Sequence, residues 1–568
     1  MITNRECRTA DYLIYESGAA QAFAAALRTS PRGRTAGFDP AVFLVGLLLT
    51  ADRYARTHVR LIHRVLTEEV PLTWQRRWGV RQERTTPDGG RTEWVLSEWD
   101  LQNVSTAIRK RLNYSEVFLP DQDEPGDRAE ERAARETRLL SATSAVIQAT
   151  LPVRPDGAND YAMDATGIWA ADRSRSPRTT APPDDPAEGA GEDREDALEV
   201  GAVIHANAVG GRASDADWGV KTRKDGSNEV FYGYHLHALT RVPETRGRQG
   251  PRSEPPLIEA IRLTPASRDV VAPSLDLIDS VLAKGQQISH LLVDRHYSYK
   301  AFDRWAIELV RRQIRQVLDL HPNDQGFSDW GGVLIAAGWA HCPYTPPDLG
   351  TIPHPGPGSS PQARQAFTSR IAERERYAAR LSKPMDETGT TRWECPAECG
   401  KAGCPLKPHT VQPAIDLGLP IVPARGTPGD PSLPALCRQR SIGLTPETDA
   451  QKRVMKVHQR TYYGSKQWQD HYAKRTYVEG AFGVLKGDSA TNKKRGSSLY
   501  TGLAHVTLEL TIFTALANLR MLRAWHKETG LGDPAHPLLI EASDDDETVT
   551  ITKAEYDELL DQRRPGAA

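Results

Sequence analysis

The chain has 568 residues, more than one hydrophobic core usually serves, so we expect roughly two to four structural units. Its 39% hydrophobic and 26% charged residues are typical of a globular protein in water. The longest apolar run, "AVFLVGLLLTA" at 41–51, is about half a membrane span, and the chain does not open on an apolar signal core. These features exclude a membrane protein, and we expect a cytoplasmic one with no membrane partner.

The first 150 residues are predicted to be mainly helical. Apolar residues recur at helical spacing between about residues 39 and 80, and Arg53, Arg56, Arg60 and Arg64 follow one another every three or four positions. A row of arginines suits contact with phosphates, but it is also common on a solvated helix surface. We predict an N-terminal helical DNA-binding region at 1–150 and keep the solvated surface as the alternative.

A mixed α/β domain is predicted at 155–335, because strand and helix patterns alternate there. An acidic stretch inside it reads as a solvated loop. The expected elements are a strand at 161–170 ("YAMDATGIWA"), the acidic loop at 182–199, a hairpin at 217–242 with "KDGSN" at its turn, a helix at 272–285, and a buried strand within 288–299 ("ISHLLVDRHYSY") that ends at Asp294.

Residues 336–449 are rich in proline, glycine and cysteine, and we interpret them as an insertion. A structural Zn²⁺ ion needs four tetrahedral nitrogen or sulfur ligands, and such a segment would gain stability from one. The candidate ligands are Cys342, Cys395, Cys399 and Cys404. Cys437, His341 and His409 lie in or near the same stretch, and Cys7 stands apart. Reduced thiols without a metal are the alternative.

The segment 451–500 is strongly basic, with eleven lysines and arginines against three acids, although the whole chain has a net charge of only −2. Within it, "HYAKRTYVEGAFGVLKGD" at 471–488 has the pattern of one amphipathic helix. A long apolar helix is expected at 505–525. Residues 450–526 thus form the second part of the core, and 527–568 form an acidic tail.

Four polar residues of the predicted helix share one face. At about 100° per residue, Tyr472, Arg475, Glu479 and Lys486 fall within an arc of about 60°. This stripe borders the apolar face rather than opposing it, so Glu479 could be joined by carboxylates from neighbouring strands.

Two further acids, Asp164 and Asp294, each stand at the expected end of an apolar strand. Three carboxylates in one place need a compensating charge, and oxygen ligands suit Mg²⁺ or Mn²⁺. Asp160 is an alternative first acid, but it stands at the start of its strand. Each acid also has a structural alternative: Asp164 could cap a turn, Asp294 could pair with a cation, and Glu479 could pair with Arg475.

The spacing of Tyr472, Arg475, Glu479 and Lys486 matches the Tyr-Arg-Glu-Lys signature of insertion-sequence DDE transposases without a gap. "MDATG" and "VDRHYSYKAF" resemble the blocks that carry the family's two aspartates. The resemblance covers residues from about 161 to 486 and the following helix. It implies an α/β core similar to ribonuclease H, interrupted by the insertion, with Asp164 on the first strand, Asp294 on the fourth and Glu479 on a helix.

The resemblance further implies two-metal phosphoryl transfer, with Mg²⁺ or Mn²⁺ held by Asp164, Asp294 and Glu479. Arg475, Lys486 and Tyr472 would contact phosphates near the cut. Family members that make hairpin ends stack a flipped base on an aromatic side chain. Trp330, Trp339 and Trp393 are candidates for that role, although a tryptophan is more often a packing residue.

The implied function is a DNA transposase that cuts transposon ends and joins them to target DNA. Its partners would be double-stranded DNA, with terminal inverted repeats and a target site, and a second copy of the chain in a homodimer. The expected location is the bacterial-type cytoplasm, at the nucleoid. Two alternatives stay open: a transposase-derived DNA-binding protein whose chemistry is dispensable, and a metal-dependent nuclease without strand transfer.

Overall fold

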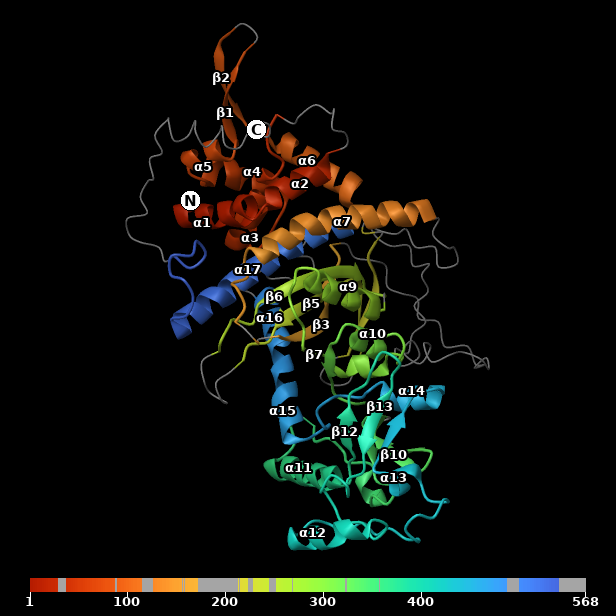
Figure 1. Cartoon of the computed structure of the whole chain (residues 1–568). Helices are drawn as coiled ribbons and strands as arrows, with labels where there is room; N and C mark the ends of the chain where they lie inside the picture. The colour runs from red at the N-terminus through yellow and green to blue at the C-terminus, as the bar shows by residue number, and fades with distance from the viewer. Residues whose placement is uncertain are drawn as a thin grey trace. The chain divides into compact units, whose positions relative to one another are not determined.

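The computed structural model describes the chain from residue 1 to residue 540 with internal gaps, and Figure 1 shows its elements. The segments that are not described are 29–36, 87–88, 115–125, 156, 158, 172–212, 214, 223–227, 245–251, 268, 322–323, 357, 488–499 and 541–568. The predicted acidic loop, most of the predicted hairpin turn and most of the acidic tail lie outside the described residues.

The chain divides into two compact units, each assembled from separate stretches of sequence. Unit 1 comprises Met1–Ala158, Ala165–Pro273 and Val478–Ala568, and unit 2 comprises Asn159–Asp164 and Ser274–Tyr477. Strand β3 (Asp160–Trp169) and helix α16 (Thr476–Lys486) therefore contribute residues to both units. Both units combine helices with strands, so the predicted α/β class is confirmed. The division of the chain into five segments stays a prediction.

The first part of unit 1 is mainly helical, as predicted. Its helices are α1 (Asn4–Asp11), α2 (Ala19–Leu27), α3 (Val42–Tyr54), α4 (Val59–Arg64), α5 (Leu72–Arg77), α6 (Glu98–Leu112) and α7 (Gly126–Gln148), and a two-stranded ribbon of β1 (Arg81–Thr85) and β2 (Arg91–Val95) stands between α5 and α6. Capping boxes at Thr3 and Ser97 satisfy the first amides of α1 and α6.

The predicted long apolar helix is α17 (Leu503–Thr529), and it organises unit 1. Every residue from Leu503 to Leu519 is buried, which explains why its sequence lacks a polar face. It packs against α3, α6, α7 and strand β6 (Ile258–Pro265). Figure 1 shows α7 and α17 side by side. No helix among the described residues is both long enough and apolar enough to cross a membrane.

The strands of unit 1 include the predicted hairpin. Strand β4 (Asp217–Thr222) pairs antiparallel with the first half of β5 (Asn228–Arg241), and β6 pairs antiparallel with its second half. On its other side β5 neighbours β3. Gly233 of β5 allows this approach, because a Cβ atom there would lie 2.0 Å from the carbonyl oxygen of Ile168.

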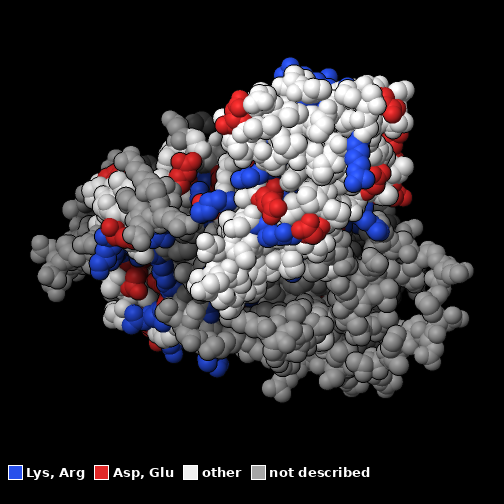
Figure 2. Space-filling view, turned by 90° about the horizontal axis from the view of Figure 1, so that it is seen from below, with Lys and Arg blue, Asp and Glu red and all other residues white. Residues whose placement is uncertain are grey.

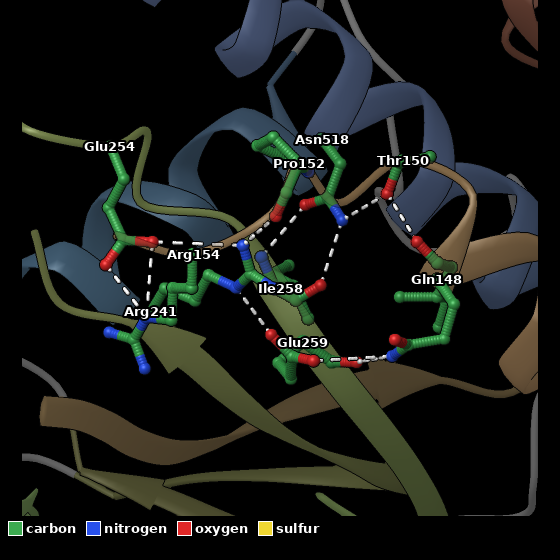
Figure 3. A network of polar contacts seen from close by, with 10 residues as sticks. Gln148, Thr150, Pro152, Arg154, Arg241, Glu254, Ile258, Glu259 and Asn518 are labelled. Carbon is green, nitrogen blue, oxygen red and sulfur yellow. Dashed lines mark hydrogen bonds and ion pairs between the residues drawn. The ribbon is translucent and has the colours of Figure 1, made fainter. Parts of the chain in front are cut away.

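Buried polar contacts join the sheet of unit 1 to its helices, as Figure 3 shows. Asn518 of α17 accepts a hydrogen bond from the Ile258 amide and donates to the Ile258 carbonyl, each at 2.9 Å. Arg241 pairs with Glu259, and Arg154 pairs with Glu254 at 2.9 Å. Because an unpaired charge is costly in a protein interior, removing one partner of either pair would destabilise unit 1.

Three parallel strands begin the core of unit 2. The first half of β3 pairs with β7 (His290–Leu292), and β7 pairs with β8 (Arg315–Val317). The predicted helix before β7 is α9 (Val271–Leu282), and α10 (Ala306–Arg311) connects β7 to β8. Parallel neighbours need such crossover connections.

The predicted insertion has more structure than its composition suggests. It contributes to two antiparallel three-stranded sheets: β9 (Ser328–Trp330), β10 (Val333–Ala336) and β11 (Trp339–His341), and β12 (Arg380–Lys383), β13 (Thr391–Glu394) and β14 (Ser441–Leu444). Its helices are α11 (Pro361–Arg376), α12 (Val411–Asp416) and α13 (Ala435–Arg438). A buried cluster around Trp339 and Trp393 forms its hydrophobic core.

The prediction of one regular helix at 471–488 is wrong. The chain forms α15 (Lys466–Tyr472), a 3-10 turn at Ala473–Arg475 and then α16. A 3-10 turn advances about 120° per residue, so the angles calculated for Tyr472 and Arg475 do not carry over to α16. Within α16 the predicted apolar positions Val478, Ala481, Phe482 and Leu485 are buried, as expected.

Candidate functional site

The parallel strands of unit 2 place three acids at one level. Ala162, Leu292 and Val317 are paired neighbours across β3, β7 and β8. Two residues further along each strand stand Asp164, Asp294 and Asp319. Adjacent strands lie about 4.8 Å apart, and residues two positions apart share a face in an extended chain, so these three residues stand at a similar level just past the paired positions.

The direction of these side chains follows from their neighbours earlier in the strands. Asp160 and His290 are paired positions, and their side chains are joined by a hydrogen bond of 2.8 Å. Asp164 stands four residues later within β3, and Asp294 stands four residues after His290 in extended backbone beyond the end of β7, which would place both on that same face. Asp164 lies inside β3 and not at its end, contrary to the prediction, because β3 continues beyond the part that pairs with β7.

The three acids have different surroundings. Asp294 caps the 3-10 turn that follows β7 by accepting the His296 amide at 2.9 Å, which leaves carboxylate capacity for another ligand. Asp319 is buried and accepts from Arg295 at 2.7 Å and from the Tyr463 hydroxyl at 2.8 Å. Asp319 therefore holds its neighbours in place, whereas Asp294 is the better candidate for metal binding.

The strand number expected for Asp294 is wrong. It follows β7, which is the fifth strand of this sheet in chain order among the described residues rather than the fourth. The additional strand is β4, the first arm of the predicted hairpin.

Arg475 and Tyr472 border this group within unit 2. A guanidinium nitrogen of Arg475 lies 3.7 Å from a carboxylate oxygen of Asp164, and both side chains are about four-fifths buried, at 18% and 23% exposure. Arg475 also lies over the Tyr472 ring, 5.8 Å from its centroid. Burial raises the pKa of Tyr472, and the negative charges of Asp319 and Asp294 add to the rise. The phenol is therefore a neutral donor near the acids.

Tyr472 is held in place by stacking. Its ring lies parallel to that of Trp468, with centroids 4.8 Å apart and an interplanar angle of 11°. Trp468 is buried and donates its indole N–H to Gln459 at 3.0 Å. The stacked pair thus fixes the orientation of the end of α15, which leads into the turn that contains Arg475.

Glu479 and Lys486 belong to unit 1. Glu479 is exposed in the first turn of α16. The Lys486 ammonium donates to the Thr166 hydroxyl and, at 2.9 Å, to the Gly167 carbonyl of β3. Lys486 therefore ties α16 to β3, which is a structural contact that the predicted phosphate role did not include.

A second polar cluster lies in unit 2, at the start of β3. The two carboxylate oxygens of Asp160 lie 2.8 Å from His290 Nδ1 and 2.8 Å from His471 Nε2. Burial alone would raise the pKa of Asp160, but the hydrogen bonds to the two histidines outweigh it and hold the pKa well below its usual range. Ligand atoms of these three residues lie within 4.8 Å of one another, a spacing that could also hold a metal ion.

This cluster is separate from Asp164. Four residues of extended strand span about 13 Å, which is too far for Asp160 and Asp164 to share one ion. Asp160 is already engaged by His290 and His471, so we keep Asp164 as the candidate first acid.

The donor chemistry at Asp164 suits Mg²⁺ or Mn²⁺, but among the described residues Asp164 and Asp294 do not belong to a group of three or more ligand atoms within 4.8 Å of one another. Asp164 and Asp294 supply hard oxygen donors on one face of adjacent strands. Arg475 is a cation of unit 2 that lies near Asp164. Glu479 lies in the other unit, so its position relative to these two acids is not described.

Several cations of the predicted DNA-binding surfaces have protein partners. Arg53 and Arg64 pair with Glu69 at 3.3 and 3.4 Å, and Arg60 pairs with Glu98 at 3.6 Å. The arginine row is also interrupted, because the chain leaves helix at Ala55 in a left-handed conformation. On the face drawn in Figure 2, lysines and arginines alternate with aspartates and glutamates among the described residues. These ion pairs support the alternative that the arginine row is a solvated helix surface.

Two of the three tryptophans considered for base stacking are packing residues. Trp393 is fully buried and donates to the Thr391 hydroxyl at 2.8 Å. Trp339 is 8% exposed and donates to the Gln459 carbonyl at 3.0 Å. Trp330 is half-buried against the same cluster. Nothing in these contacts singles out a stacking residue.

Sequence reasoning missed Asp319, His290 and His471. Asp319 could have been found, because "QVLDL" repeats the pattern of an apolar strand that ends in an acid, as in "LLVD". The histidines could not, since they lie 130 and 311 positions away from Asp160 and carry no common motif. Only the pairing of β3 with β7 and the position of α15 bring them together.

Comparison with known proteins gave no relative. No family model, curated protein or solved structure matches the chain. The arrangement of Asp164, Asp294 and Arg475 therefore carries the functional argument.

Proposed function

We propose that the chain is a DDE-type DNA transposase that cleaves the ends of a mobile element and joins them to target DNA. The observation that carries the proposal is the common level of Asp164 and Asp294 on one face of adjacent parallel strands, with Arg475 3.7 Å from Asp164. Glu479 enters on the sequence signature alone, as the third carboxylate. The two ends would be held by a homodimer, as the resemblance implies.

The arrangement of strands supports a core of the ribonuclease H type. Strand β3 has β5 as a neighbour in unit 1 and β7 as a parallel neighbour in unit 2, and β8 continues the parallel set. An antiparallel series, a helix and then parallel strands follow one another along the chain. In open α/β sheets ligands bind beyond the carboxyl ends of the parallel strands. Asp294 stands beyond the end of β7, and Asp164 stands just past the part of β3 that pairs with β7.

The proposed chemistry assigns a task to each residue. Asp164, Asp294 and Glu479 would hold Mg²⁺ or Mn²⁺, which when bound supplies Lewis-acid polarisation of a phosphodiester and an acidified water or hydroxyl. Arg475 would exchange its long contact with Asp164 for a non-bridging phosphate oxygen, since a guanidinium binds phosphate in a forked geometry. Tyr472 would donate its phenolic proton in a hydrogen bond to an adjacent phosphate.

Lys486 has a different task in this account. Because its ammonium already donates to Thr166 and Gly167, it would fix α16 on β3 and reach a phosphate only with its remaining donor. The runner-up function is a DNA-binding protein whose chemistry is dispensable. The intramolecular partners of Arg475 and Lys486 favour this alternative, because they give both side chains a role other than holding a phosphate at the cut. A metal-dependent nuclease without strand transfer is the other alternative.

The test is an assay of purified protein on DNA that carries the sequences flanking its own gene, in Mg²⁺ or Mn²⁺. The proposal expects cuts at the element's ends and joined products with target DNA, and binding without cleavage for Glu479→Gln. Cuts without joined products would indicate the nuclease. Binding without cleavage by the native protein under either metal would indicate the DNA-binding protein.

A further inference from the structure

Four of the six cysteines gather in one buried region of unit 2. Cys395, Cys404 and Cys437 belong to the hydrophobic cluster of the insertion, and their residues are 5%, 5% and 8% exposed. Cys342, 5% exposed, lies in the adjoining cluster, and Tyr344 packs against both clusters. Burial raises the pKa of the Cys342 thiol, and the nearby thiols of Cys437, Cys395 and Cys404 add to the rise.

Two of these cysteines stand in turns that direct backbone amides at sulfur. In both turns proline follows the cysteine, and the chain closes by a hydrogen bond to the cysteine carbonyl, from Thr345 at 3.0 Å and from Lys407 at 2.8 Å. Burial raises the pKa of the Cys342 and Cys404 thiols, and backbone hydrogen bonds from Tyr344 and Leu406 oppose this rise. Amides aimed at sulfur stabilise a thiolate, which is the form that binds a metal.

A buried cation stands beside the same group. Lys407 is 6% exposed, donates to the Gln439 carbonyl at 2.7 Å and pairs with Glu398 at 3.5 Å. Burial raises the pKa of the Cys404 and Cys437 thiols, and the Lys407 charge opposes this rise. Four thiolates around Zn²⁺ carry a net charge of −2, so a neighbouring lysine ammonium would offset part of it.

The other candidate ligands of this region are engaged elsewhere. The thiol of Cys399 donates to the Pro396 carbonyl at 3.4 Å. Both ring nitrogens of His341 are occupied, by the Trp339 carbonyl at 2.9 Å and the Tyr462 hydroxyl at 2.7 Å. His409 is a surface residue with its side chain 67% exposed. The set predicted from the sequence therefore changes, with Cys437 in place of Cys399.

We propose that Cys342, Cys395, Cys404 and Cys437 bind one structural Zn²⁺ ion. The ligands come from four separate segments, following β11 and β13, before α12 and within α13, so the ion would join both small sheets of the insertion. Four thiolates fill a tetrahedral site and leave no position for substrate. Among the described residues, the group whose ligand atoms already lie within 4.8 Å of one another is Asp160, His290 and His471, and not these four cysteines. The four sulfurs would therefore have to move closer together to bind the ion.

The test begins with the zinc content of the full-length protein purified without chelator, measured by plasma mass spectrometry. We expect about one ion per chain in the native protein and in the controls Cys399→Ala and Cys7→Ala, and at least an approximately fivefold loss in Cys437→Ala and Cys404→Ala. Zinc retained in Cys437→Ala but lost in Cys399→Ala would overturn the proposed ligand set.

A second measurement uses the native protein alone, so it does not depend on the folding of a variant. Unfolded protein is reconstituted with Co²⁺, and four thiolates should produce strong thiolate-to-metal charge-transfer absorption with the intense visible bands of tetrahedral cobalt. A mercurial reagent should then release the metal as four thiols react. Weak octahedral-type bands, or no zinc in the purified protein and no uptake on reconstitution, would overturn the proposal.

Discussion

Asp164 and Asp294 owe their common face to the pairing of β3 with β7, which the bond between Asp160 and His290 fixes four residues earlier. We predict that Asp164→Asn and Asp294→Asn each lower Mg²⁺-dependent DNA cleavage by more than about 100-fold, because even outer partners of metal ligands typically cost 10- to 100-fold. Initial rates of plasmid cleavage measure this loss.

The matched control for these variants is Asp303→Asn, an exposed acid of unit 2 that pairs with Lys452. It should cleave DNA at the native rate. Equal losses in all three variants would mean that the substitutions act through stability, and unchanged cleavage in Asp294→Asn would remove that residue from the site.

The Asp160 cluster makes a separate prediction about pH. Its folded pKa is depressed, so the stabilisation is present above the unfolded value of about 3.9 and is lost as the pH falls through the folded value. Asp160→Asn should destabilise the protein by roughly 1–3 kcal/mol at pH 7, and the difference from the native protein should shrink below about pH 4.

Thermal unfolding at several pH values checks this prediction. If the stability difference between Asp160→Asn and the native protein were equal at pH 7 and pH 3, the charge of the carboxylate would not contribute, and only the shape of the side chain would matter. Asp303→Asn serves again as the control, since its side chain is 61% exposed.

At the scale of elements, Lys486 holds the last turn of α16 on β3. We predict that Lys486→Ala lowers the stability of the DNA-free protein by about 1–2 kcal/mol, because two hydrogen bonds from a charged donor are lost. Lys474→Ala, in the 3-10 turn before α16, is the control and should change stability little. If only DNA affinity fell in Lys486→Ala, the lysine would act as a phosphate contact and not as a tie.

Asn518 has the corresponding position between α17 and β6. Asn518→Ala leaves the Ile258 amide and carbonyl and the Thr150 hydroxyl without this partner inside unit 1. We expect a loss of about 2–4 kcal/mol and faster hydrogen exchange at the start of β6. Asn103→Ala, at an exposed position of α6, should change neither. Native exchange at β6 in Asn518→Ala would contradict this role.

Most elements could be predicted because their patterns are local. The strand at 161–170, the hairpin arms, the helix before Asp294 and the buried helix at 505–525 all carry their own periodicity. The break at Ala473–Arg475 could not, since a 3-10 turn continues an amphipathic pattern and differs only in its hydrogen bonds. The core of the insertion was missed because its apolar residues are spread over many short elements.

The candidate site divides in the same way. Asp164 and Asp294 could be found from the sequence, because each follows a run of apolar residues. Other features depend on segments that are distant in the sequence. These are the contact of Lys486 with β3, the hydrogen bonds of Asp319 with Arg295 and Tyr463, and the nearness of Cys437 to Cys404. No spacing in the sequence encodes such contacts.

For the whole molecule, the central claim is that Asp164, Asp294 and Glu479 hold one divalent metal centre. Asp164 and Asp294 belong to unit 2, and Glu479 belongs to unit 1. Asp160, His290 and His471 form a competing candidate site, and their nitrogen donors suit transition metals better than Mg²⁺.

The most direct test maps the bound metal on the native protein. Fe²⁺ replaces Mg²⁺, ascorbate and peroxide generate hydroxyl radicals at the ion, and mass spectrometry locates the backbone cuts. We predict cuts beside residues 164, 294 and 479 that Mg²⁺ suppresses, that Asp294→Asn abolishes and that His471→Gln leaves intact. Cuts that His471→Gln abolishes and Asp294→Asn leaves intact would place the metal at the histidine cluster and contradict the account.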